Sequence, residues 1–197
     1  MKILASFILF VLAILSIPAE AKTVCTIGDS VIKKGQAWRG DMQMLRPEFV
    51  YVGNYFDDLY LHDGIGGDKA TDVIARLDTI NGCDVALVHV GGNDLANGAT
   101  GLQIVNRLTI IADNLIAKGM IVWIDTILPC NDGCGTTWNL AIANVNYQIK
   151  TKMTAYNIND VWSAFMDSGY GGLLYVDHFH PSALGYSVLA NYTAPKL

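Results

Sequence analysis

Short apolar runs alternate with amphipathic segments along most of the chain. Runs typical of β-strands occupy residues 23–27, 49–52, 84–90 and 120–126, with a weaker one at 158–161. Apolar positions about one helical turn apart predict helices over residues 36–45, 69–77, 102–117, 138–156 and 181–191. Residues 55–62 are aromatic and acidic without a clear period, and we expect a loop there.

The run at 84–90 indicates how these elements assemble. It is almost wholly apolar and rich in β-branched residues, which is typical of a strand buried on both faces of a parallel sheet. Strands that alternate with helices predict an α/β fold with a doubly wound parallel sheet. Ligands of such folds bind beyond the carboxyl ends of the strands, so the residues that directly follow the strands are the candidate site residues.

The N-terminus has the three parts of a secretory signal peptide. A positive start at Met1-Lys2 precedes an apolar run over residues 3–17, and Ala19-Glu20-Ala21 supplies the small residues of a cleavage site. The run is shorter than the roughly 20 residues of a membrane span, although an uncleaved anchor is the alternative. We therefore expect a signal peptide over residues 1–21, and a secreted or periplasmic domain over 22–197 without stable membrane insertion.

Charge restricts the partners of this domain. The formal net charge is −5, and the sequence contains no run of Lys and Arg that suits a nucleic-acid backbone. The composition therefore predicts no nucleic-acid partner and favours a neutral or small substrate.

The cysteines are expected to pair, because export places them in an oxidising compartment. Cys130 and Cys134 enclose a short loop with a glycine for the turn, which favours a disulfide between them. Cys25 and Cys83 each begin a predicted strand and can pair if those strands are neighbours, which the sequence leaves open. A zinc site is the competing interpretation, but no histidine lies at ligand spacing from the cysteines.

The first predicted strand runs into a turn that is suited to a nucleophile. Gly28-Asp29-Ser30 places Ser30 where the strand ends, and Gly28 allows a sharp turn. A serine hydroxyl needs a neighbouring base and hydrogen-bond donors for the oxyanion that it creates. By itself, such a tripeptide is more often an ordinary loop or a helix cap.

The remaining parts of a serine hydrolase site follow other predicted elements. Asp177 and His180 lie three residues apart before the last helix, so His180 can act as the base and Asp177 can orient its ring. The backbone N–H groups of Ser30 and Gly67 and the side-chain amide of Asn93 can form an oxyanion hole.

These residues resemble the four sequence blocks of the GDSL-type or SGNH hydrolases. The blocks here are Gly28-Asp29-Ser30, Gly64-Ile65-Gly66-Gly67-Asp68, Gly91-Gly92-Asn93-Asp94 and Asp177-x-x-His180-Pro181. The resemblance implies a flavodoxin-like three-layer α/β/α sandwich over residues 22–197. It also implies hydrolysis of carboxylic esters or thioesters through an acyl-serine, without a cofactor or metal. Small-molecule, lipid and acylated-carbohydrate esters all fit as substrates.

One block departs from the family pattern. Ser30 is followed by Val31-Ile32-Lys33-Lys34, whereas the family usually has Leu or Ile and then Thr. Val31 preserves the apolar packing position, and the lysines are expected at the rim of the pocket. The choice of Gly67 over Gly66 as the oxyanion donor depends on aligning Gly66-Gly67-Asp68 with the second block of the family.

Several alternatives stay open at this point. The same site can serve an acyltransferase, or the fold can be a non-catalytic carbohydrate- or lipid-binding module. Asp177, His178 and His180 can be combined into a metal site, and Asn93 can be an ordinary helix cap. His62 and His89 lack partner motifs and are expected to be surface or packed residues.

Overall fold

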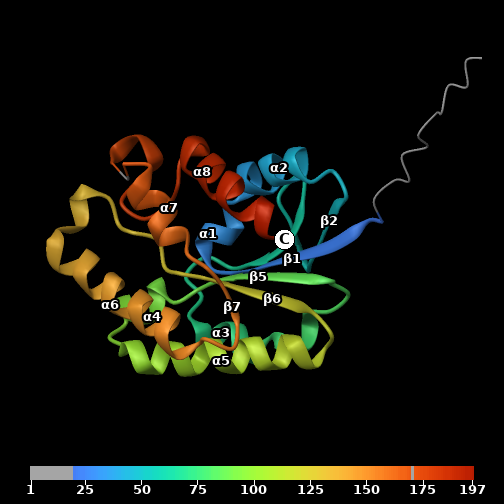
Figure 1. Cartoon of the computed structure of the whole chain (residues 1–197), viewed down its shortest axis with the longest axis horizontal. Coiled ribbons are helices and arrows are strands. Elements are labelled where there is room, and N and C mark those ends of the chain that lie inside the picture. The colour runs from blue at the N-terminus through green and yellow to red at the C-terminus, as the bar shows by residue number, and fades with distance from the viewer. Residues whose placement is uncertain (1–19, 170) are drawn as a thin grey trace, which may run out of the picture.

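The computed structural model describes residues 20–169 and 171–197, so almost all of the predicted signal peptide lies outside the described residues. The described part of the chain forms a three-layer α/β/α sandwich with a mostly parallel central sheet (Figure 1). This architecture confirms the fold class that the alternating strands and helices predict.

The sheet has seven strands in the order β3-β4-β1-β5-β6-β7, with β2 paired to β1 beside this path. All pairings are parallel except that of β3 with β4. The strands are β1 (Lys22–Gly28), β2 (Phe49–Val52), β3 (Tyr55–Phe56), β4 (Leu61–Gly64), β5 (Val85–His89), β6 (Ile121–Asp125) and β7 (Asn157–Asn159). Because β1 and β5 are central neighbours, their carboxyl ends meet at one edge of the sheet.

Helices cover both faces of the sheet (Figure 1). One face carries α1 (Ser30–Lys33), α2 (Gln36–Leu45), α7 (Val161–Asp167) and α8 (Ala183–Thr193). The other carries α3 (Ala70–Ala75), α4 (Gly92–Ala96), α5 (Gly101–Ala117) and α6 (Thr136–Lys152). Short 3₁₀ helices occupy Leu77–Thr79, Asp132–Cys134, Gly172–Leu174 and Ala194–Lys196.

The apolar residues form two clusters, one under each helical layer. Every residue of β5 is buried, as expected for a strand covered on both faces. Alternate residues of β5 enter opposite clusters, with Val85 and Leu87 on the α2/α8 side and Ala86 and Val88 on the α3/α5 side. This two-sided burial fixes the strand ends that carry the candidate site.

The loop predicted over residues 55–62 is wrong, because this region contains β3 and the first half of β4. Both strands are short, the two residues of β3 are exposed, and the buried side chains of β4 are polar, so no apolar alternation marks them in the sequence. His62 and Asp63 are buried all the same. His62 Nδ1 accepts a hydrogen bond from the N–H of Gly64, and Asp63 accepts hydrogen bonds from Asn54.

The end of the predicted fifth strand also differs. The strand stops at Asn159, and Val161 begins α7, which the sequence analysis did not predict. The Asp160 side chain caps this helix by accepting a hydrogen bond from the N–H of Ser163. The closing helix begins at Ala183, because Ser182 caps it and Pro181 pairs with Tyr175 in a β-bridge.

Both cysteine pairs form disulfides. Cys25–Cys83 joins β1 to the segment before β5, with a Cα–Cα distance of 5.7 Å. The two strands are neighbours in the sheet, which is the arrangement that this pairing required. Cys130–Cys134 closes the predicted short loop, with a Cα–Cα distance of 6.0 Å. Within the described ranges, no helix is long and apolar enough to cross a membrane.

Candidate active site

Ser30 lies at a sharp turn between β1 and α1. Gly28 has a φ of +153°, and a Cβ there would lie 1.9 Å from the carbonyl oxygen of His89, so the turn requires glycine. The Asp29 side chain caps α1 by accepting a hydrogen bond of 2.9 Å from the N–H of Val31. Together these features place Ser30 at the first position of the helix.

Ser30, His180 and Asp177 form a continuous hydrogen-bonded chain. His180 Nε2 is 2.8 Å from Ser30 Oγ, and His180 Nδ1 is 2.7 Å from Asp177 Oδ2. Both distances are within the range expected for a nucleophile, its base and the group that orients the base. The structure therefore brings together the three residues that the sequence predicts as nucleophile, base and orienting carboxylate.

Asp177 is held in its ionised form. Burial alone would raise its pKa, but hydrogen bonds from the N–H of Phe179, the ring of His180 and the N–H of His180 outweigh burial and hold the pKa well below its usual range. Lys34 Nζ lies 4.0 Å from the same carboxylate, and both side chains are about half exposed. Lys34 therefore lies beside the candidate triad rather than in its hydrogen-bonded chain.

A disulfide-closed loop supports the segment that carries Asp177. Asn131 Nδ2 donates a hydrogen bond of 2.7 Å to the carbonyl of Asp177, and the N–H of Asn131 donates one of 3.1 Å to the carbonyl of His178. The Cys130–Cys134 disulfide encloses Asn131. The spacing of the cysteines predicts this disulfide, but nothing in the sequence links the loop to residues 177–178.

The structure supports the three predicted oxyanion donors, Ser30, Gly67 and Asn93, to different degrees. Asn93 shares the cavity with Ser30, and one N–H of its amide donates to the carbonyl of Asp68 at 2.9 Å, which leaves the second N–H for a ligand. The N–H groups of Ser30 and Gly67 have no hydrogen-bond partner within residues 20–169 and 171–197. Gly67 has a φ of +86° and follows Gly66, whose Cβ would lie 3.9 Å from Ser30 Cβ, but Gly67 does not line the cavity.

Two charged side chains that the sequence analysis missed hold these turns together. Arg76 Nη2 donates to the carbonyls of Gly28 and Asp63, and Arg76 Nε donates to the Asp68 side chain. Asp94 is fully buried and accepts from the N–H of Ala70 and from Arg107. Asp94 belongs to the Gly-Gly-Asn-Asp block, so the sequence contained a signal from which its role could have been predicted. Arg76 belongs to no motif.

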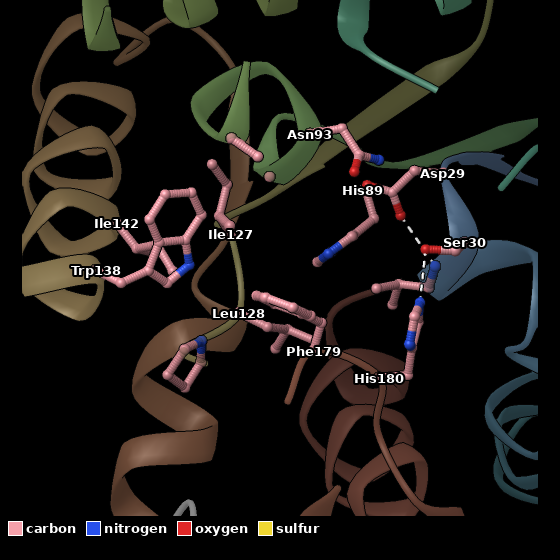
Figure 2. Close-up of a pocket in the computed structure, with 14 residues that line it drawn as sticks. Asp29, Ser30, His89, Asn93, Ile127, Leu128, Trp138, Ile142, Phe179 and His180 are labelled. Carbon is pink, nitrogen blue, oxygen red and sulfur yellow. Dashed lines mark hydrogen bonds between the residues drawn. The ribbon is translucent and has the colours of Figure 1, made fainter. Parts of the chain in front are cut away.

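A cavity of about 200 Å³ opens beside Ser30 (Figure 2). Its polar side contains Asp29, Ser30, His89, Asn93 and His180. The opposite wall is apolar and includes Ile127, Leu128, Trp138, Ile142 and Phe179. The cavity is therefore polar near the candidate nucleophile and apolar away from it.

His89 is the least expected member of this cavity. It is 4% exposed and its Nδ1 lies 3.3 Å from Asp125 Oδ2, at the ends of β5 and β6. Burial alone would lower the pKa of His89, but its hydrogen bond to Asp125 and the negative charges of Asp125 and Asp29 raise the pKa above its usual value. A polar residue at the end of an otherwise apolar strand was the available signal in the sequence.

The remaining histidines have other surroundings. His178 Nδ1 lies 2.9 Å from Asn131 Oδ1, so its ring has a different partner from that of His180. Over the described residues, no group of three or more His, Cys, Asp or Glu side chains is arranged to hold a metal ion. His62 lies in β4 opposite Tyr55 of β3. Burial, together with the positive charge of Arg39, lowers the pKa of His62 to about 4.

Comparison with known families agrees with this geometry. Residues 26–188 match the GDSL-like lipase/acylhydrolase family, and this span includes Ser30, Asn93, Asp177 and His180. The chain belongs to the GDSL-like lipase/acylhydrolase family. Among curated proteins, no sequence matches significantly.

Several solved structures of esterases share the fold of this GDSL-like protein. A member of the lipolytic G-D-S-L family from Veillonella parvula has 16% identity and a TM-score of 0.72, covering 88% of this chain and 96% of that chain. An acetylxylan esterase from Geobacillus stearothermophilus also has 16% identity and a TM-score of 0.72, with 90% and 94% covered. A carbohydrate esterase family 3 protein from Talaromyces cellulolyticus has 20% identity and a TM-score of 0.70, with 89% and 95% covered. These identities establish likeness of fold.

Proposed function

We propose that the protein is an exported serine esterase that hydrolyses short-chain carboxylic esters through an acyl-serine intermediate. The observation that carries this proposal is the chain of hydrogen bonds from Asp177 through His180 to Ser30, which ends at the polar side of a cavity. A serine, an imidazole and a carboxylate in this order constitute an activated nucleophile.

The proposed reaction proceeds in two halves. His180 Nε2 takes the proton of Ser30 as Oγ attacks the ester carbonyl carbon, and the protonated ring then gives that proton to the leaving alcohol. In the second half, His180 takes a proton from water as the water oxygen attacks the acyl carbon, and the ring then returns that proton to Ser30 Oγ as the acid is released. Asp177 stays ionised throughout and stabilises the imidazolium, in agreement with its low pKa.

Hydrogen-bond donors would stabilise the oxyanion of both tetrahedral intermediates. We assign this role to the N–H groups of Ser30 and Gly67 and to the side-chain amide of Asn93. The N–H groups of Ser30 and Gly67 have no partner in the described ranges, and Asn93 retains an unused amide N–H. Such preorganised donors are the largest catalytic contribution in many acyl-transfer enzymes.

The size of the cavity supports a short acyl chain. Its volume of about 200 Å³ is below the roughly 300–1,000 Å³ of pockets that enclose drug-sized ligands. Trp138 and Ile142 form its apolar wall opposite Ser30. Solved structures with this fold include acetylxylan esterases and an acetyl esterase, which favours acyl groups of similar size.

Export is supported by the sequence of the first 21 residues and by the cysteines. The two disulfides account for all four cysteines, and disulfides persist mainly in oxidising compartments. We therefore place the enzyme outside the cytoplasm.

Hydrolysis of p-nitrophenyl acetate, butyrate and octanoate by the domain over residues 22–197 tests the proposal. We expect turnover that decreases from acetate to octanoate and that is lost in Ser30→Ala. Ser168→Ala, which alters an exposed serine outside the cavity, is the matched control and should retain full turnover. Equal turnover by Ser30→Ala would reject the serine mechanism, and preferred cleavage of the octanoate would reject the short-chain assignment.

A further inference from the structure

The proposed reaction does not use one polar group inside the cavity. His89 ends β5 opposite Gly28 of β1, and its side chain extends into the cavity between Ser30 and Trp138 (Figure 2). The residue is 96% buried, and its Nδ1 is hydrogen-bonded to the carboxylate of Asp125. Within the described part of the chain, Nε2 of His89 has no hydrogen-bond partner.

The Asp125 carboxylate also determines whether His89 Nε2 accepts or donates a hydrogen bond. A carboxylate at Nδ1 keeps a proton on that nitrogen, so Nε2 accepts a hydrogen bond when the ring is neutral and donates one when the ring is protonated. Asp125 is itself fixed, because its Oδ1 accepts a hydrogen bond of 2.8 Å from Asn159. A hydroxyl group both donates and accepts, and it therefore complements Nε2 in either state of the ring.

The apolar wall of the cavity makes a hydrogen-bond partner for His89 Nε2 important for substrate selection. A hydrocarbon chain packed against Trp138 and Ile142 would exclude water from the cavity and cover Nε2. A buried polar atom without a partner carries a free-energy cost, which would disfavour such a substrate. A substrate hydroxyl at the same position would satisfy Nε2 and avoid this cost.

We propose that His89 is a specificity-determining residue whose Nε2 hydrogen-bonds a hydroxyl group of the substrate. Asp125 is the positioning residue that orients the ring. The inference rests on the proposed ester hydrolysis and narrows its substrates to short esters with a hydroxyl close to the scissile bond. The hydroxyl belongs either to the acyl part or to the alcohol part of the ester. In both cases it would make the same hydrogen bond with Nε2.

Two pairs of nearly isosteric esters test this proposal. On the acyl side, p-nitrophenyl 3-hydroxypropanoate is compared with p-nitrophenyl butyrate. On the alcohol side, 2-hydroxyethyl acetate is compared with propyl acetate. Rates of alkaline hydrolysis correct for intrinsic reactivity. We expect the wild-type protein to prefer the hydroxylated ester of one pair by about 10- to 100-fold in kcat/KM.

Variants of His89 identify the source of this preference. In His89→Leu we expect the ratio of kcat/KM values within that pair to fall to about one, whereas His89→Gln should retain a preference in the same direction. Asp125→Asn should lower the ratio, because the ring loses its orienting charge. His62→Asn alters a buried histidine outside the cavity and should leave the ratio unchanged.

The ratio is measured within one preparation, so partial misfolding of a variant cancels. Absence of a preference in the wild-type protein for both pairs would overturn the proposal, and so would an unchanged ratio in His89→Leu. Either result leaves Ser30-dependent hydrolysis intact. Failure of the proposed function would instead appear as loss of Ser30-dependent turnover on all four esters.

Discussion

Ser30 and His180 are separated by 150 positions in the sequence, yet their side chains lie 2.8 Å apart. The contact depends on two local features. The turn at Gly28 presents Ser30 at the end of β1, and the bonds of Asp177 hold the ring of His180. Each feature comes from residue types with a direct physical role, which is why the motifs allowed these residues to be predicted.

Asn93 provides a test of the oxyanion site at the residue scale. We expect Asn93→Ala to lower kcat by about 10²–10³ with little change in KM, because in the proposed mechanism its amide stabilises charge that develops in the transition state. Steady-state kinetics on p-nitrophenyl acetate measure both constants. Asn114→Ala is the control, since Asn114 is exposed on α5 outside the cavity and, among the described residues, its side chain bonds only the carbonyl of Ile110. Full activity of Asn93→Ala would remove this residue from the oxyanion hole.

His62 predicts a pH dependence of stability. Its pKa is about 4 in the folded protein against 6.5 for an ordinary histidine, so the unfolded chain binds a proton that the folded chain does not. The resulting stabilisation is fully present above pH 6.5 and is lost progressively as the pH falls towards 4. We expect a loss of about 1–3 kcal/mol.

Urea denaturation at pH 7 and pH 4 measures this effect. His62→Asn keeps a hydrogen-bond acceptor for the N–H of Gly64 but cannot titrate, so its loss of unfolding free energy between the two pH values should be smaller. Equal losses in the two proteins would contradict the account of His62.

At the scale of elements, the loop closed by Cys130–Cys134 is joined to the segment that carries Asp177. Asn131 donates to the carbonyls of Asp177 and His178. Small displacements of catalytic groups lower rates steeply, so the loop should affect turnover more than it affects stability.

We expect Asn131→Ala to lower kcat by about 10- to 100-fold with KM nearly unchanged, because Asp177 and His180 lose their support. Replacing Cys130 and Cys134 together with serine should act in the same direction. Asn114→Ala on the exposed side of α5 is the control. If kcat is unaffected in both variants while thermal unfolding is lowered, the loop is a stabilising element and not a support for the triad.

The elements also show the limits of prediction from sequence. The strongly periodic strands and helices were found because apolar burial determines their pattern, as in β5. The short β3 and β4 and helix α7 were missed, because their positions depend on polar contacts and caps such as Asp63 with Asn54. The triad followed from motifs. The support from Asn131 and the cavity position of His89 required the fold, since their partners are distant in sequence.

At the scale of the whole molecule, the two disulfides have different roles. Cys25–Cys83 spans 58 residues and joins the middle of the central strand β1 to the segment that precedes β5. Cys130–Cys134 spans 4 residues and closes the loop that is hydrogen-bonded to the segment of the proposed triad residue Asp177. A longer closed loop restricts the unfolded chain more strongly, so the first disulfide should contribute more to stability.

Replacing Cys25 and Cys83 with alanine should lower the free energy of unfolding by about 4 kcal/mol, and removing Cys130–Cys134 by about 2 kcal/mol. Denaturant unfolding of the two double variants provides the comparison. The material that remains folded after loss of Cys25–Cys83 should keep its specific activity. A larger loss of stability from Cys130–Cys134 would reverse the assigned roles.

The most direct measurement is the identification of the residue that acts as the nucleophile. The domain over residues 22–197 is treated with a fluorophosphonate that has a short alkyl chain, and intact mass and peptide mapping locate the adduct. The account predicts one adduct per chain on Ser30, slow labelling in His180→Ala and no labelling in Ser30→Ala. An adduct on another residue, or ester hydrolysis that survives full modification of Ser30, would contradict it.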